Sequence, residues 1–245
     1  MSHKLSAVFL VSVLAVMLPL LGADELKPAQ VTNTERVDFL PGGTLRIDGS
    51  YGSLNVEGWD QPTVEISVTR SLRFGKSKTQ EQDQRRLESI RVVANRNSPT
   101  ELTISTTIAS RHGDWVPFRS PITTASVTAE VEIHVPRDTR LAIRHHTGYV
   151  FVSGVTGDIE ASASRGDIVL MLPDSGSYSI DAKTKIGAVS SDFEGSALSR
   201  YLVGQRFVRT LTPPSQQLYL RMGFGGITIK AVPPEVEAPM TAVTK

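Results

Sequence analysis

One pattern of apolar and polar positions occurs five times in this chain. Each copy has two apolar residues separated by one position, four turn residues, a glycine, and two more alternating positions, as in Leu45, Ile47, Gly52, Leu54 and Val56. The glycine follows the first apolar residue by seven positions in every copy. The five glycines are Gly52, Gly148, Gly166, Gly187 and Gly225. Alternation predicts half-buried β-strands, and a glycine at a fixed place between them predicts a corner.

Two arrangements satisfy this pattern, a parallel β-solenoid of stacked coils and an antiparallel sandwich in which each copy is a hairpin. The glycines of copies two to four are 18 and 21 residues apart, and the small residues Ala161 and Ala182 occupy core positions. Both features favour stacking. We therefore expect an all-β fold, with a β-solenoid-like stack of strand–turn–Gly–strand repeats over 137–230 and a more irregular antiparallel half over 40–136.

The remaining segments carry simpler signals. Residues 64–68 and 127–135 alternate strictly and predict strands, the second ending at Pro136. A stretch rich in Gln, Glu and Arg predicts one short helix over 79–90. Residues 24–36 look like a loose polar lead-in. Residues 193–216 predict either a degenerate repeat or a packed excursion, and 231–245 carry three prolines and predict a flexible tail.

The first 23 residues resemble a secretory signal peptide. Lys4 is the only charge before Asp24, and an apolar run ends in Gly22 and Ala23. We expect cleavage near Ala23, with an uncleaved anchor as the alternative. The chain has no cysteine, which excludes a lipoprotein, disulfides and thiolate chemistry. The protein is therefore expected to be exported, to the periplasm or the cell surface.

The overall charge offers no general attraction for nucleic acid. The chain has 26 Lys and Arg residues against 25 Asp and Glu residues, and removing Lys4 leaves 25 of each. A nucleic-acid partner is not expected.

Several short motifs resemble a bacterial putative-adhesin family of unknown function, built from β-strand repeats and similar to autotransporter adhesins. They include Val56-Glu57-Gly58-Trp59-Asp60, Val135-Pro136-Arg137-Asp138-Thr139, Gly157-Asp158-Ile159 and Gly166-Asp167-Ile168. The likeness covers roughly 40–230. The resemblance implies a β-repeat fold and offers no catalytic residue to carry over.

Aligning the copies places five cations in the turns before the glycines, namely Arg144, Arg165, Lys183, Lys185 and Arg221. If the copies stack, these side chains lie along one edge and could bind an anionic glycan or a phosphate. The alternative is a solvated edge whose charges oppose aggregation.

Two further pairs of residues are candidates for a functional site, but a structural role explains each pair better. His145 and His146 face opposite sides of a strand, so we expect solvated turn histidines rather than a metal site. Asp158 and Asp167 could bind Ca²⁺ or form a glycosidase pair. An aspartate at a turn more often accepts hydrogen bonds from backbone amides.

The loop 109–122 holds the last candidates. Ser110, His112 and Asp114 lack a nucleophile elbow and do not predict a catalytic triad. Trp115 and Phe118 are candidates for a contact surface, or for a loop that caps the β stack.

Taken as a whole, the sequence predicts an exported, non-enzymatic β-repeat protein with an adhesin-like interaction role or a structural role in the cell envelope. No catalytic, cofactor-binding or metal-binding residue is expected. The alternative is a carbohydrate-active enzyme, a polysaccharide lyase or a glycosidase, on a β-solenoid. An enzyme should place an acid, a base and a charge stabiliser near one point.

Overall fold

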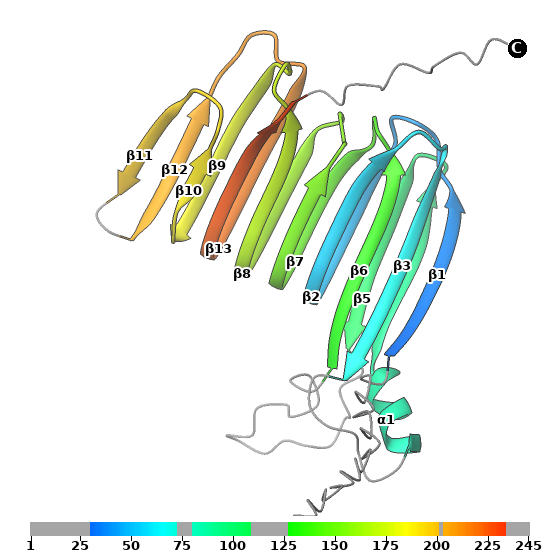
Figure 1. Ribbon diagram of the computed structural model, residues 1–245. Helices are drawn as coiled ribbons and strands as arrows, with labels where there is room; N and C mark the ends of the chain where they lie inside the picture. The colour runs from blue at the N-terminus through cyan, green and yellow to red at the C-terminus, as the bar shows by residue number, and fades with distance from the viewer. Residues whose placement is uncertain (1–29, 73–79, 109–126, 201–202, 234–245) are drawn as a thin grey trace, which may run out of the picture.

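The computed structural model describes residues 30–72, 80–108, 127–200 and 203–233. Outside these ranges lie the predicted signal segment 1–23, the loop residues Ser110, His112, Asp114, Trp115 and Phe118, and residues 234–245. Within them the chain forms one open 13-stranded sheet and one short helix (Figure 1). The elements are β1 (Gln30–Asp38), β2 (Thr44–Trp59), β3 (Thr63–Leu72), α1 (Gln80–Leu87), β4 (Ile90–Ser98), β5 (Glu101–Ile108), β6 (Val127–Pro136), β7 (Arg140–Ser153), β8 (Ile159–Pro173), β9 (Tyr178–Ile186), β10 (Val189–Ser191), β11 (Ser196–Arg200), β12 (Gly204–Arg209) and β13 (Gln216–Val232).

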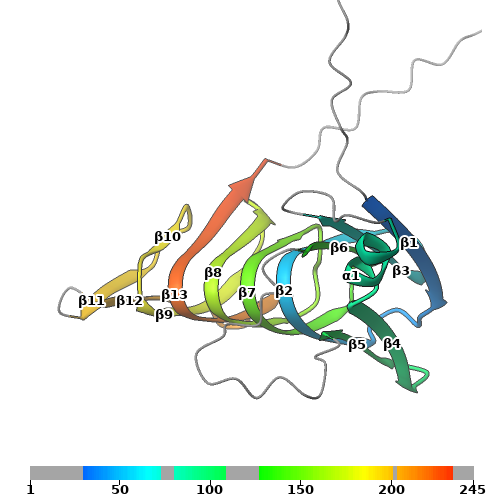
Figure 2. The same ribbon diagram turned by 90° about the horizontal axis from the view of Figure 1, so that it is seen from below.

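Four long strands, β2, β7, β8 and β13, bend in the middle and belong to two layers of the sheet (Figure 2). Their first halves lie in a layer with the order β4-β5-β2-β7-β8-β13-β9-β12-β11. Their second halves lie in a layer with the order β1-β3-β6-β2-β7-β8-β13-β10. The pairing among these four strands is parallel, so copies one, two, three and five are each one bent strand and not a hairpin. The fourth copy is divided at Gly187 into β9 and β10, and both pair in parallel with β13.

The bend of each long strand is at its repeat glycine. Gly52, Gly148, Gly166 and Gly225 are direct partners across neighbouring strands. All four have positive φ, between 106° and 136°. A Cβ on Gly166 would lie 1.9 Å from the carbonyl oxygen of Gly148. The corners stack too closely for any side chain, which explains why glycine recurs at this one position.

The core lies between the two layers and is made by the alternating apolar residues of the repeats. Ile143, Val150, Ile168, Leu170 and Leu220 are all almost completely buried. A second, smaller apolar cluster joins α1 to the end of the sheet through Leu87 and Ile90. Across the described ranges, no helix has the length and apolar character that a membrane crossing requires.

The order of the copies in space differs from their order in the chain. The fifth copy, β13, lies between the third, β8, and the fourth, β9. The segment before it forms β11 and β12, an antiparallel pair that extends the first layer beyond β9. The stretch 193–216 is thus a packed excursion of the chain rather than a sixth copy.

Three expectations about the first half need correction. The polar segment 30–36 is not a loose lead-in, because β1 pairs with β3 and joins it through hydroxyl pairs such as Thr32–Thr69 at 2.9 Å. The helix ends at Leu87, since Ile90 already pairs in β4. The half over 40–136 is only partly antiparallel, because β2 pairs in parallel with both β5 and β6.

Candidate ligand groove

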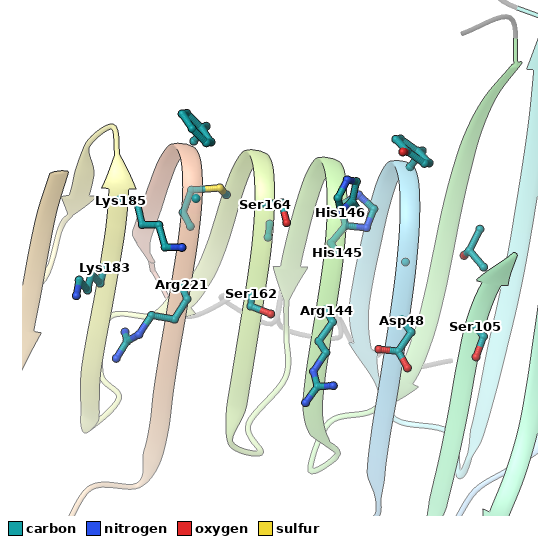
Figure 3. A pocket seen from close by; sticks show the side chains of 17 residues that line it. Asp48, Ser105, Arg144, His145, His146, Ser162, Ser164, Lys183, Lys185 and Arg221 are labelled. Atoms are coloured by element: carbon teal, nitrogen blue, oxygen red, sulfur yellow. The ribbon is translucent and has the colours of Figure 1, made fainter. Parts of the chain in front are cut away.

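Parallel register brings equivalent turn residues of the copies side by side. The residues four positions before the corner glycines form one cross-strand row, in the order Asp48, Arg144, Ser162, Arg221 and Lys183. Ser105 of β5 continues the row beside Asp48. Figure 3 shows these side chains following one another across neighbouring strands.

This row lies in an open groove with a volume of about 990 Å³. Four of the five cations predicted from the sequence line it, namely Arg144, Lys183, Lys185 and Arg221. The fifth, Arg165, is not a lining residue. Its guanidinium lies 5.7 Å from the ring centre of Phe224, which does line the groove.

Arg221 is held in place by its neighbours. It donates hydrogen bonds to the Asp181 carboxylate, at 2.9 Å from Nη2, and its guanidinium lies 3.5 Å from the ring centre of Tyr219. Arg206 also pairs with Asp181, at 2.9 Å. Burial acts to raise the pKa of Asp181, but the hydrogen bonds from Arg206 and Arg221 outweigh it, so this pKa is lowered. The one carboxylate of Asp181 therefore pairs with two guanidinium groups, and this group of three side chains keeps a net positive charge.

The other three cations of the groove are uncommitted. Arg144, Lys183 and Lys185 are exposed, and none of them has a side-chain ion pair or hydrogen bond among the residues that the structure describes. Asp48 is the one carboxylate among the lining residues. These three side chains can meet an anion without first breaking an internal contact.

The two turn histidines differ in a way that the sequence analysis did not predict. His146 is exposed and contacts Tyr51 edge-on, with ring centres 5.5 Å apart. His145 is only 6% exposed, and its Nε2 lies 3.0 Å from the carbonyl oxygen of Gly52. Burial lowers its pKa. The expectation of a solvated residue is therefore wrong for His145, because alternation along the strand turns it inward.

Asp158 and Asp167 act in strand pairing. Oδ1 of Asp158 accepts a hydrogen bond from the backbone N–H of Gln217 at 2.8 Å, and Oδ1 of Asp167 accepts one from Gly226 at 2.7 Å. Both carboxylates thus accept hydrogen bonds from backbone amides of β13. Within the described ranges, no group of three or more His, Cys, Asp or Glu residues could hold a metal ion.

Sequence reasoning missed the aromatic part of the groove. Tyr51 and Phe224 each precede a corner glycine, and both line the groove. They occupy one register row, through Thr147 and Arg165 on the strands between them. Aligning the position immediately before each glycine would have found this row.

Comparison with known proteins gives matches to solved structures at low sequence identity. No family model and no curated protein matches the chain. A putative cell adhesion protein from Clostridium sporogenes is 12% identical, with a TM-score of 0.48, and the match covers 82% of this chain and all of that one. A putative adhesin from Parabacteroides distasonis is 13% identical, with a TM-score of 0.33, over 83% of this chain and 66% of that one. A putative adhesin from Bacteroides fragilis is 11% identical, with a TM-score of 0.24, over 83% of this chain and 99% of that one.

The names of these structures agree with the family that the sequence resembles. Their TM-scores are too low to support a function for this chain.

Proposed function

We propose that this chain is an exported, non-enzymatic β-repeat protein with an adhesin-like role, and that it binds an anionic component of the cell envelope in the groove. In this proposal the copies are the coils of a β-solenoid-like stack, and the turn edge of the stack is the binding surface. The observation that carries the proposal is a set of three cations without internal partners, Arg144 from the second copy and Lys183 and Lys185 from the fourth, which parallel register brings into one groove.

The glycosidase form of the enzyme alternative finds little support in the groove. A glycosidase of the common type needs two carboxylates that flank the bond to be cleaved. Among the lining residues only Asp48 is a carboxylate. Asp158 and Asp167, the pair that the sequence offered, bond backbone amides of β13 instead. Binding without catalysis fits these residues better.

Local charge, and not total charge, drives the proposed binding. The chain as a whole is nearly neutral, at +1. The groove concentrates Arg144, Lys183 and Lys185, with only Asp48 against them. Each exposed ion pair contributes about 0–1 kcal/mol, so an anionic polymer that contacts several cations at once is favoured over a single small anion.

The test compares the mature protein with the variant Arg144→Ser/Lys183→Ser/Lys185→Ser. The probes are polygalacturonate, inorganic polyphosphate and phosphatidylglycerol vesicles, each at low and at physiological salt. We expect the parent to bind at least one probe, more weakly at higher salt because ions screen exposed charges. We expect the variant to bind about tenfold more weakly, since three contacts are lost.

A matched control removes the same charge elsewhere. The variant Arg91→Ser/Arg140→Ser/Lys230→Ser also loses three positive charges, from exposed residues that do not line the groove. It should bind like the parent. Equal losses of affinity in both variants, or a parent that binds no probe, would show that the groove is only a solvated edge.

A further inference from the structure

We infer that the groove takes one linear acidic polysaccharide, laid across the strands, with its anionic groups on the cations and its sugar faces on Tyr51 and Phe224. This inference rests on the proposed function and names the ligand class of the same site. Three features of the groove point to it: its direction, the spacing of its charges and its aromatic row.

The groove runs perpendicular to the strands, from β5 across β2, β7, β8 and β13 to β9. Neighbouring strands in a sheet are about 4.8 Å apart, so these six strands span about 24 Å. A sugar in an extended polysaccharide advances by a length similar to one strand spacing. Successive strands can therefore address successive sugars of a chain that lies in the groove.

The charges in the groove are interrupted by neutral hydroxyl groups. Ser162 separates Arg144 from Arg221 in the row, and Asp48 precedes Arg144. A nucleic acid has a phosphate at every nucleotide and would place negative charge against Asp48. A polysaccharide presents hydroxyl groups between its acidic groups, and these can pair with Ser162 and Ser105.

The aromatic row supplies flat apolar surfaces for sugar rings. Tyr51 is 43% exposed and Phe224 is 51% exposed, and they stand three strand spacings apart in the same register row. Both rings have a neighbour that holds them: His146 contacts Tyr51 edge-on, and the guanidinium of Arg165 lies over one face of Phe224. Binding sites for small polar ligands combine such aromatic walls with a few placed polar groups.

The hollow shape favours a single chain over a membrane surface. The floor of the groove is formed by His145, Ala163 and Met222, which lie below the exposed rim residues. A flat bilayer would contact only the rim, through residues such as Tyr51 and Phe224. A polymer chain can lie in the hollow and contact the rim and the row of polar side chains together.

The test is a calorimetric titration of the mature protein with oligogalacturonates of increasing length. We expect affinity to rise with length until the chain spans the groove, at about five sugars, and then to level off. The fully methyl-esterified hexamer, which lacks the charges, should bind about tenfold more weakly. Variant Arg144→Ser/Lys183→Ser/Lys185→Ser should also bind the charged hexamer about tenfold more weakly than the parent does.

The aromatic contacts have their own test. Tyr51→Ala/Phe224→Ala should weaken binding of the charged hexamer several-fold and leave binding of inorganic polyphosphate unchanged, because phosphate does not stack on a ring. Tyr149→Ala is the matched control, since Tyr149 is an exposed aromatic residue that does not line the groove. It should bind both probes like the parent.

Two failures are distinguishable. Binding of polyphosphate or phosphatidylglycerol vesicles through the three cations, without binding of the hexamer, would overturn the polysaccharide and leave the proposed function standing. Absence of binding to every anionic probe would overturn both. Hexamer affinity that does not depend on length, or that is unchanged in the aromatic variant, would also overturn the inference.

Discussion

The role of each turn residue depends on its distance from the corner glycine. Residues four positions before the glycine, such as Arg144 and Lys183, point outward into the groove. Residues three positions before it point inward, and His145 is the one aromatic ring among them. It fits because Gly49 lies opposite, where a Cβ would be only 2.5 Å from Nδ1 of His145. A change of one position therefore separates an exposed side chain from a buried one.

Burial of His145 makes stability depend on pH. Burial is the main cause that lowers its pKa, and the hydrogen bond with Gly52 opposes this only in part. The folded protein therefore binds this proton less readily than the unfolded chain does. The contribution of neutral His145 to stability should be complete above the ordinary histidine pKa of 6.5. The free energy of unfolding should decrease as pH falls below that value.

Urea titrations at about pH 7.5 and about pH 5.5 measure this effect. The variant His145→Gln keeps a donor for the carbonyl of Gly52 but does not titrate. We expect it to show a smaller loss of stability on acidification than the parent. The same loss in both proteins would mean that another group is responsible.

At the scale of the element, the repeat is a strand that turns a corner without ending. The corner requires positive φ and also the absence of a side chain, and the two requirements can be separated experimentally. Gly166 has φ of 117°, and an added Cβ would lie 1.9 Å from the oxygen of Gly148. Gly42 has φ of 72°, but its nearest neighbour would be Asp138 at 3.8 Å.

Replacing each glycine by alanine should therefore have different consequences. Gly42→Ala adds only backbone strain, about 1 kcal/mol. Gly166→Ala also forces neighbouring backbones apart and should lower the free energy of unfolding by more than about 3 kcal/mol, or prevent folding. Denaturant unfolding of both variants measures the difference. Equal costs would show that φ alone selects glycine at the corner.

At the scale of the whole molecule, the sequence shows how the residues of the repeat copies align with one another, but not which copies are neighbours in the sheet. The constant seven-residue distance to glycine was enough to align Arg144, Arg221 and Lys183. All copies carry the same pattern, so nothing local shows that β13 lies between β8 and β9. Strand β1 was missed because its side chains are almost all polar and its pairing depends on backbone and hydroxyl groups.

The groove depends on this unpredicted order, since Arg221 bridges the row between Ser162 and Lys183. The chain has no cysteine, so introduced pairs can be oxidised without competition. In the variant Arg221→Cys/Lys183→Cys the two residues are direct partners on adjacent strands, about 5 Å apart, within the range of a disulfide. In Ser162→Cys/Lys183→Cys they are two strands apart, about 10 Å, which is beyond that range.

The most direct measurement is the intact mass of both double-cysteine variants after mild oxidation and thiol labelling. An intramolecular disulfide in Arg221→Cys/Lys183→Cys, with free thiols in Ser162→Cys/Lys183→Cys, is the predicted result, because the fifth copy separates the third from the fourth. A disulfide in the second variant and free thiols in the first would mean that the copies stack in chain order. Lys183, and not Arg221, would then lie beside Ser162, and the order of side chains in the groove would be wrong.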